Sequence, residues 1–235
     1  GGMAILSAND TNYIYWRNKL ASKGLVVLGV EFRNIGGAQG NHPFPAGLND
    51  CISALKWVYE NKKELGISKI ILSGESGGGN LSIATTLKAK QDGIVNYIDG
   101  VYAQCPYISN RYDKGENKLK SLVENDTYFL RGDMNNIMAS LYDGVDSKNP
   151  LAWPYHADKT LLEGLPPHVI TVNELDPLRD EGLVFSRKLE EAGVKVRSKI
   201  IKGTVHASEC IFPLDIPEIH NAAIEDIKNF SYNLN

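Results

Sequence analysis

A glycine-rich turn around one serine is the feature that most restricts how this chain folds. Residues 70–80 read IILSGESGGGN, a β-prone run followed by glycines, and an apolar helical pattern starts directly after them. Glycine lets the backbone adopt positive φ angles or approach another group closely, at an entropic cost to folding. The segment therefore predicts a sharp strand-to-helix turn that holds either a nucleotide phosphate or the hydroxyl group of Ser76.

Two phosphate-binding patterns do not fit this turn. A phosphate loop needs Lys and then Ser or Thr after the glycines, whereas the chain has Asn80 and Leu81 there. A dinucleotide-binding fingerprint needs Gly-x-Gly-x-x-Gly, and Ser76 stands in the place of its second glycine. The spacing of Gly74, Ser76 and Gly78 instead matches Gly-x-Ser-x-Gly, a turn that lifts a nucleophilic serine above the sheet. The N-terminus of the helix that follows favours negative charge developing at the same place.

An acid and a histidine follow this serine in the order Ser, Asp, His. A predicted strand at 168–174 leads to Asp176, and a predicted strand at 196–202 leads to His206. Ligands of parallel sheets bind at the carboxyl ends of the strands, so these two side chains and Ser76 are expected to converge there.

The other histidines and acids near this pattern receive different interpretations. His168 opens a strand and is expected to be structural, whereas His156 and His220 are expected on the surface or as helix caps. Asp180 and Glu174 remain open as alternative acids for the triad.

Strands and helices alternate along the rest of the chain. Strands are predicted at 25–32, 69–73, 100–105, 168–174 and 196–202, and helices at 12–23, 48–65, 77–90, 180–192 and 217–232. This alternation predicts a mostly parallel, twisted α/β sheet with helices on both faces. Residues 109–150 are polar and interrupt the rhythm, so they are expected to form a cap or lid above the sheet. The catalytic core then comprises residues 1–108 and 151–235.

Net charge, apolar runs and cysteine number exclude several classes of partner. The 235 residues carry a formal net charge of −3, so neither nucleic acid nor an anionic lipid surface is expected. No apolar run reaches the roughly 18 residues that a membrane-spanning helix needs. Three widely separated cysteines form neither a disulfide framework nor a paired metal motif. They predict free thiols, no metal ion and a cytoplasmic location, with a removed N-terminal signal as the alternative.

Several segments together resemble the α/β-hydrolase esterases of the hormone-sensitive-lipase-like type, the family IV carboxylesterases. The first, Gly1-Gly2-Met3, is similar to the end of the family's His-Gly-Gly-Gly oxyanion loop. The others lie in the family's order at residues 30–33, 42–46, 74–80 and 176–181. The match runs over nearly the whole chain, although Glu75 and Gly77 replace the Asp and Ala that are usual in the family.

The resemblance implies a carboxylesterase that hydrolyses short-to-medium acyl esters and needs no cofactor. Ser76 would be the nucleophile, His206 the general base and then acid, and Asp176 the group that orients His206. The oxyanion hole would consist of the backbone N–H groups of Gly1, Gly2 and Gly77. An amidase or peptidase with the same triad is one alternative. A non-catalytic ligand-binding protein is the other, but hormone receptors that resemble this family lack the triad histidine.

The resemblance also gives expectations about the pocket, the partners and the length of the protein. Part of the cap would line the acyl pocket, with Tyr107, Tyr128, Phe129 and Trp153 as candidates that core packing explains equally well. The expected partner is a small-molecule ester, and a homodimer is left open. The family has several strands before its oxyanion loop, one of them inside the sheet. We therefore expect roughly a hundred further N-terminal residues in the natural protein, missing from this chain or associated with it as a separate segment.

Overall fold

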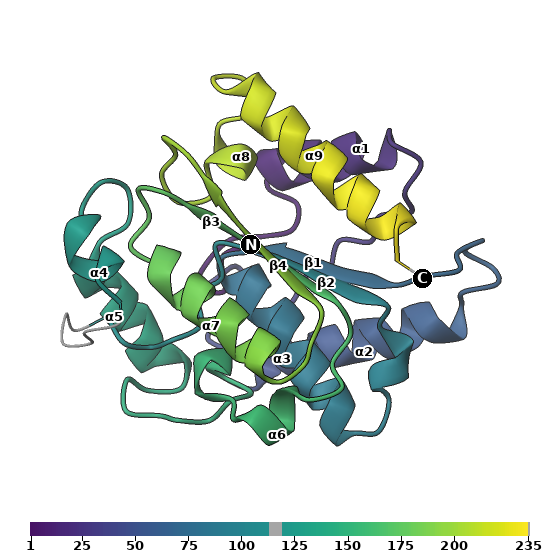
Figure 1. Cartoon of the computed structure of the whole chain (residues 1–235), viewed down its shortest axis with the longest axis horizontal. Coiled ribbons are helices and arrows are strands. Elements are labelled where there is room, and N and C mark those ends of the chain that lie inside the picture. The colour runs from purple at the N-terminus through teal and green to yellow at the C-terminus, as the bar shows by residue number, and fades with distance from the viewer. Residues whose placement is uncertain (113–118, 235) are drawn as a thin grey trace.

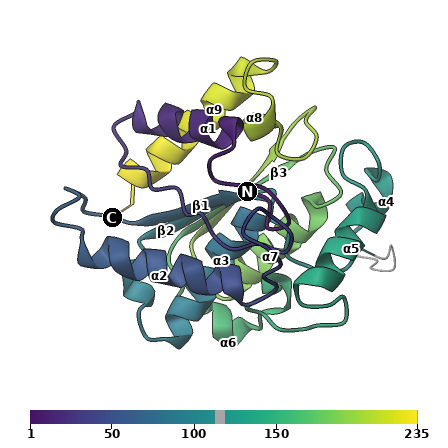
Figure 2. The same cartoon turned by 180° about the vertical axis from the view of Figure 1, so that it is seen from behind.

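The computed structural model describes residues 1–112 and 119–234 as an alternation of strands and helices (Figures 1 and 2). The strands of the described residues are β1 (Ile71–Glu75), β2 (Gly100–Gln104), β3 (His168–Asn173) and β4 (Val196–Ile201). The longer helices are α1 (Thr11–Ala21), α2 (Ala46–Glu60), α3 (Gly77–Gln91), α5 (Gly132–Tyr142), α7 (Arg179–Glu191) and α9 (Pro217–Tyr232). The short ones are α4 (Ser121–Glu124), α6 (Lys159–Leu162) and α8 (Ser208–Ile211), with 3₁₀ turns at Val95–Tyr97 and Pro154–His156.

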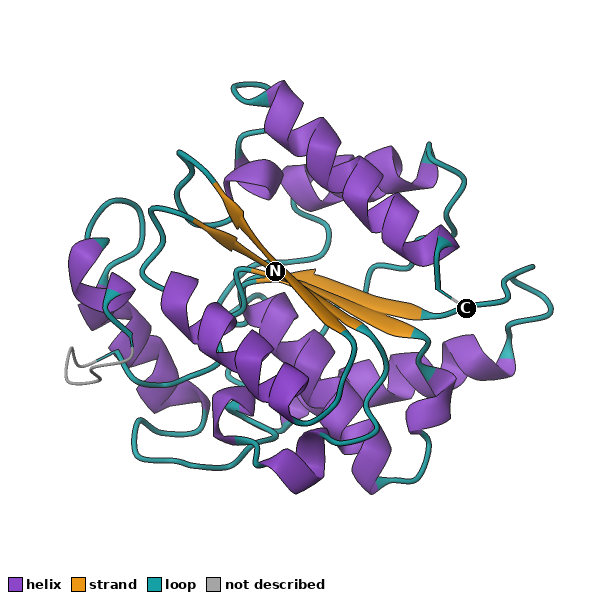
Figure 3. Ribbon diagram, viewed as in Figure 1, coloured by secondary structure: helices purple, strands orange, loops and turns teal. Residues whose placement is uncertain are grey.

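The strands form one parallel sheet in the order β1-β2-β3-β4. Helices cover both faces, with α1, α8 and α9 on one side and α2, α3, α6 and α7 on the other (Figures 1 and 3). This confirms the predicted mostly parallel α/β sheet. Because parallel strands end at one edge, the loops after β1, β3 and β4 open on the same side of the domain. Ser76, Asp176 and His206 lie in those three loops.

Two apolar layers enclose the sheet because successive strand side chains point to opposite faces. Ala103 and Ile170 pack in the cluster that joins the sheet to α2, α3 and α7. Tyr102 and Val169, their neighbours in sequence, pack in the cluster with α1 and α9. Burial on both faces explains the nearly continuous apolar runs of β2 and β3.

The described part of the region 109–150 holds two helices, α4 and α5. Residues 113–118 of the predicted cap lie outside the described residues. The described part contributes Leu122 and Tyr142 to a third apolar cluster, in which they pack with Tyr107, Trp153 and Leu178. Leu178 directly precedes α7, so this region packs against the loop that carries Asp176.

The strand predicted at 25–32 is wrong. These residues have no regular secondary structure and form no ladder with other described residues, and Val26 and Leu28 expose 53% and 41% of their surface. A groove of about 540 Å³ is lined by both this segment and β1. An apolar run alone does not make a strand, because a strand also needs a partner segment at hydrogen-bonding distance.

The cysteines and the lengths of the helices bear on two expectations from composition. Cys51, Cys105 and Cys210 are all free, as predicted. Among the residues that the structure describes, no helix has both the length and the apolar character needed to cross a membrane.

Candidate active site

Ser76 occupies a strained turn between β1 and α3. Its φ of 53° and ψ of −118° lie in a region that a residue with a side chain rarely adopts. Three backbone hydrogen bonds hold it there: its N–H donates to Gln104 O at 2.9 Å, and its carbonyl accepts from Asn80 N at 3.0 Å and Tyr107 N at 3.1 Å. The surrounding backbone thus fixes the serine at the carboxyl end of the sheet, as the motif predicts.

The glycines beside Ser76 allow three backbone segments to approach one another. A Cβ atom on Gly74 would lie 2.3 Å from the carbonyl oxygen of Gly78, and real Cβ atoms do not come so close to backbone. A Cβ on Gly78 would lie 2.7 Å from Gly1 N, and one on Gly77 would lie 2.5 Å from Met3 N. Residues 1–3 therefore pack directly on the first turn of α3.

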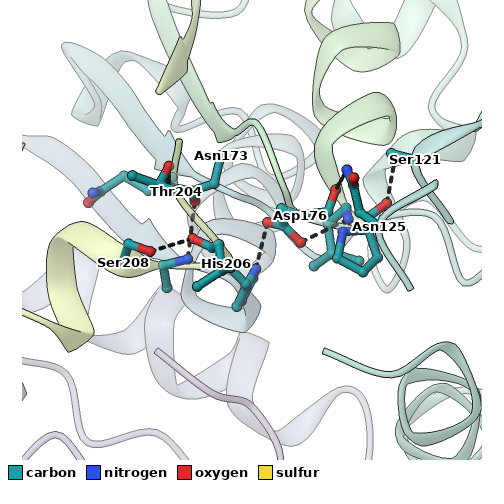
Figure 4. A network of polar contacts seen from close by, with 12 residues as sticks. Ser121, Asn125, Asn173, Asp176, Thr204, His206 and Ser208 are labelled. Atoms are coloured by element: carbon teal, nitrogen blue, oxygen red, sulfur yellow. Dashed lines mark hydrogen bonds and ion pairs between the residues drawn. The ribbon is translucent and has the colours of Figure 1, made fainter. Parts of the chain in front are cut away.

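A buried hydrogen bond joins Asp176 to His206 (Figure 4). His206 Nδ1 lies 2.7 Å from Asp176 Oδ2, and the two side chains are 5% and 0% exposed. The second carboxylate oxygen, Oδ1, accepts from Leu178 N at 2.9 Å. Residues 174–178, called the acid loop below, thus present the carboxylate to the imidazole in a fixed orientation.

The charge on His206 reflects two opposing effects. Burial disfavours the imidazolium and acts to lower the pKa of His206, whereas the adjacent Asp176 carboxylate acts to raise it. Glu75 and Glu209 add to the raising effect, and the pKa of His206 lies above its ordinary value of 6.5.

The two alternative acids do not contact His206. Glu174 lies 2.7 Å from Lys202 Nζ and accepts a hydrogen bond from Gly203 N. Asp180 accepts hydrogen bonds from Arg179 Nε at 2.9 Å and from Ser121 N at 2.8 Å. Of the three candidate acids, Asp176 is the one that the fold pairs with His206.

A buried network that the sequence did not reveal supports the loop of His206. Asn173 Oδ1 accepts from Ala207 N at 3.1 Å, and its Nδ2 donates to Thr204 Oγ1 and Glu209 Oε2, both at 2.9 Å. Figure 4 shows Asn173 and Thr204 beside His206. The position of Asn173 at the end of β3 is the one sequence signal for this role.

Glu75 connects the serine turn to the start of the chain. It is 6% exposed, accepts a hydrogen bond from the Tyr13 hydroxyl, and its Oε2 lies 3.9 Å from the Gly1 amino group. Burial, together with the Glu75 carboxylate, raises the pKa of Tyr13, so the phenol stays protonated and donates. The helical spacing of Tyr13 marks it as a core residue and gives no hint of this contact.

Three further histidines were expected to be structural (His168) or to lie on the surface or cap a helix (His156 and His220). His168 is buried at the start of β3, its Nδ1 lies 2.7 Å from Pro166 O, and burial lowers its pKa to about 4. His220 is also buried, against the carbonyl of Glu209 and the Trp16 ring, because α9 packs on α1 and α8. It is therefore not a surface residue, and its contact with a carbonyl of α8 fits the alternative of a helix cap. His156 is half-buried and lies 2.8 Å from Asn110 Oδ1.

The four aromatic residues considered for the acyl pocket separate into two pairs. Tyr107 and Trp153 are buried in the apolar cluster beneath α5, with ring centroids 5.5 Å apart. Tyr128 and Phe129 are 61% and 45% exposed. Core packing therefore accounts for Tyr107 and Trp153.

One group of metal-ligand atoms lies at this site among the described residues. Cys105, Asp176 and His206 each offer one such atom, all within 4.8 Å of one another. Burial raises the pKa of the Cys105 thiol well above its ordinary value, which opposes the thiolate that a metal ion needs. These donors therefore suit the hydrogen bond between Asp176 and His206 better than a metal ion.

Known proteins share this fold. A family model described as alpha/beta hydrolase fold matches residues 1–209. An arylesterase of Saccharolobus solfataricus is 33% identical over 88% of this chain and 65% of its own length. Carboxylesterase NlhH of Mycobacterium tuberculosis is 33% identical over 83% of this chain and 60% of its own length. This chain thus spans less than two thirds of these relatives.

Solved structures agree with the sequence relatives. Brefeldin A esterase, a bacterial homologue of human hormone-sensitive lipase, superposes with a TM-score of 0.95 and 46% identity, over 98% of this chain and 65% of its own. Esterase Est22 gives a TM-score of 0.91 and 43% identity, over 98% and 70%. The chain belongs to the alpha/beta hydrolase fold family, among proteins related to hormone-sensitive lipase.

Proposed function

We propose that this chain carries the catalytic centre of a carboxylesterase that acts on short-to-medium acyl esters. The observation that carries the proposal is the buried hydrogen bond between His206 and Asp176, located at the sheet edge where the strained turn holds Ser76. Sequence and structural relatives named as esterases support the same reaction class.

In the proposed mechanism Ser76 Oγ attacks the ester carbonyl carbon while His206 Nε2 accepts the hydroxyl proton. The resulting imidazolium is stabilised by Asp176, whose hydrogen bond to Nδ1 also fixes the tautomer. The tetrahedral intermediate collapses to an acyl-enzyme as the bond to the alkoxy oxygen breaks, and His206 gives its proton to that oxygen, so the leaving group departs as the alcohol. A water molecule then attacks the acyl-enzyme with His206 as base, which releases the carboxylic acid and regenerates Ser76.

The oxyanion hole is proposed to consist of backbone N–H groups of Gly77, Gly1 and Gly2. The close approach of residues 1–3 to the first turn of α3 supports this assignment, as does the positive end of the α3 dipole. Such donors stabilise the oxyanion as it forms, and the loss of one typically costs about 3 kcal/mol of transition-state stabilisation.

Three further features of the protein remain predictions. The region 109–150 is proposed as a cap over the acyl pocket. Three free cysteines support a cytoplasmic location. A homodimer stays an open expectation, and the partner proposed for the site is a small-molecule ester.

Hydrolysis of p-nitrophenyl esters of short and long acyl chains tests this function. Ser76→Ala is expected to lower kcat/KM by roughly 10³-fold or more, because no nucleophile remains. Ser73→Ala is the matched control, since Ser73 is an exposed serine of the same strand, β1. Equal activity in Ser76→Ala and the unaltered chain would refute the proposal, and p-nitroanilide substrates separate an esterase from an amidase.

A further inference from the structure

Helix α4 of the 109–150 region lies against the acid loop, although about fifty residues separate them along the chain. Figure 4 shows Ser121 and Asn125 on one side of Asp176 and His206 on the other. The acid loop thus lies between the imidazole of His206 and the segment 121–125, which contacts it through hydrogen bonds.

The side chain of Asn125 holds the backbone of the acid loop directly. Its Nδ2 donates to Glu174 O at 3.0 Å and to Asp176 O at 3.1 Å, so one amide spans both sides of Leu175. Asn125 is 4% exposed. Each carbonyl also accepts a hydrogen bond from Arg179 at 3.1 Å, through Nη1 on Glu174 O and through the backbone N–H on Asp176 O. Asn125 is the residue that ties both carbonyls to the 109–150 region.

Ser121 holds the next part of the same loop. Its hydroxyl donates to Pro177 O at 2.7 Å and accepts from Asp180 N at 3.1 Å, while its own N–H donates to Asp180 Oδ2 at 2.8 Å. The side chain is fully buried. Together with Asn125 it binds the carbonyl groups of three acid-loop residues.

These contacts act on the backbone of Asp176 and not on its carboxylate. The carboxylate itself is directed by Leu178 N on Oδ1 and His206 Nδ1 on Oδ2. A side chain can keep its 2.7 Å contact with His206 only if the Cα atom beneath it stays in place. The backbone contacts from Asn125 and Ser121 therefore help to hold the carboxylate at the imidazole.

We propose that Asn125, assisted by Ser121, is a positioning residue for the Asp176–His206 pair, so that the 109–150 region sets the geometry of the catalytic centre. This inference rests on the proposed esterase function for its kinetic consequences. Asn125 does not touch the substrate or the reacting atoms in this account, and it acts through Asp176 alone.

The charged groups around the pair define what a displacement of Asp176 does. His206 is faced by Asp176 from the acid loop, Glu75 from β1 and Glu209 from α8. The acid loop is flanked by Arg179, which lies 2.9 Å from Glu124 of α4. When Asp176 moves away, His206 loses its nearest carboxylate but stays buried. The loss of the carboxylate and the remaining burial both favour the neutral imidazole.

The test compares Asn125→Ala with Asn110→Ala in the full chain. Asn110 is a matched control because it is also a buried asparagine of this region, and its Nδ2 donates to the carbonyls of Gly144, Val145 and Ser147. Both substitutions remove hydrogen bonds from a buried amide to backbone carbonyls, so both destabilise the fold. Of these two asparagines, Asn125 is the one that contacts the acid loop.

Two readouts are measured on each variant. Kinetics on p-nitrophenyl acetate should show kcat lower by about 10²-fold in Asn125→Ala, with KM within about twofold, because a misplacement of 1 Å costs that much. NMR titration of ¹⁵N-labelled histidine should show the pKa of His206 lower by roughly half a unit or more. Asn110→Ala should leave both quantities unchanged.

Ser121→Ala and Ser121→Thr form a second pair. The threonine keeps the hydroxyl that binds Pro177 O, so it should restore most of the kcat that Ser121→Ala loses. Unchanged kcat and unchanged His206 pKa in a folded Asn125→Ala protein would overturn the proposal. Equal shifts in Asn110→Ala would also overturn it, because they would trace the effect to general destabilisation. The NMR titration needs no turnover, so it decides the inference even for a chain that hydrolyses no ester.

Discussion

The Nδ1 atom of His206 lies 2.7 Å from Oδ2 of Asp176, and this hydrogen bond joins the loops that follow β3 and β4. Both groups are almost completely removed from solvent. A buried carboxylate beside an imidazole stabilises the charged form of the imidazole, which is the form that the proposed mechanism produces after Ser76 has lost its proton.

The first prediction concerns the pH dependence of hydrolysis. His206 must be neutral to act as base, and its pKa lies above 6.5, so the acidic limb of kcat/KM should have its midpoint above that value. Asp176→Asn removes the nearest charge and leaves burial to lower the pKa of His206. The variant should lose roughly 10⁴-fold in kcat, and its acidic limb should move to lower pH. A pH–rate profile measures both effects, and a limb that does not move would contradict the assigned pairing.

The second prediction concerns the glycine at the end of β1. Gly74→Ala would place a Cβ atom 2.3 Å from the carbonyl oxygen of Gly78, and both groups belong to backbone that cannot easily shift. The free energy of unfolding should fall by about 2 kcal/mol or more. Gly36→Ala is the control, because its nearest neighbours are 3.7 Å away, and it should change stability by less than about 0.5 kcal/mol. Urea unfolding of the two variants gives the comparison, and similar losses would argue against the close approach.

The third prediction concerns stability at mildly acidic pH. The pKa of His168 is about 4 in the fold, whereas an unfolded histidine has a pKa of 6.5. As the pH falls from 6.5 towards 4, the unfolded chain binds a proton at this position that the folded chain does not, so His168 destabilises the fold in that window. The loss attributable to His168 should reach about 2 kcal/mol between pH 7 and pH 5.

His168→Asn tests this prediction, because asparagine keeps a donor for Pro166 O and does not titrate. The variant should lose less stability than the unaltered chain between these two pH values. The raised pKa of His206 has the opposite sign: it contributes stability below 6.5 that is lost as the pH rises through its folded pKa. Comparison at matched pH removes that common contribution. A His168→Asn variant that loses as much stability as the unaltered chain between these pH values would contradict the assignment.

Local sequence patterns predicted the bounds of those helices and strands that have a clear apolar periodicity. The helix predicted at 217–232 coincides with α9, and the strand predicted at 196–202 differs from β4 by one residue. The placement of Ser76, Asp176 and His206 after parallel strands also followed from the sequence, since the strand ends of such a sheet share one edge.

Features that depend on tertiary contacts were not predictable in the same way. Residues 25–32 have the apolar run of a strand but lack a partner among the described residues. The burial of His220 depends on how α9 packs on α1 and α8. The hydrogen bonds from Asn125 to the acid loop join segments about fifty residues apart, and no spacing within either segment marks them.

Trapping of the acyl-enzyme is the decisive test of Ser76 as the nucleophile. The protein is mixed with p-nitrophenyl acetate, quenched in acid within milliseconds to seconds, and examined by intact-mass and peptide mass spectrometry. A transient acetyl group should appear on the peptide that contains Ser76. It should be absent from Ser76→Ala and longer-lived in His206→Ala at equal initial labelling. Release of p-nitrophenol without any acetyl group on Ser76, or an acetyl group on another residue that turns over at the same rate, would contradict this role of Ser76.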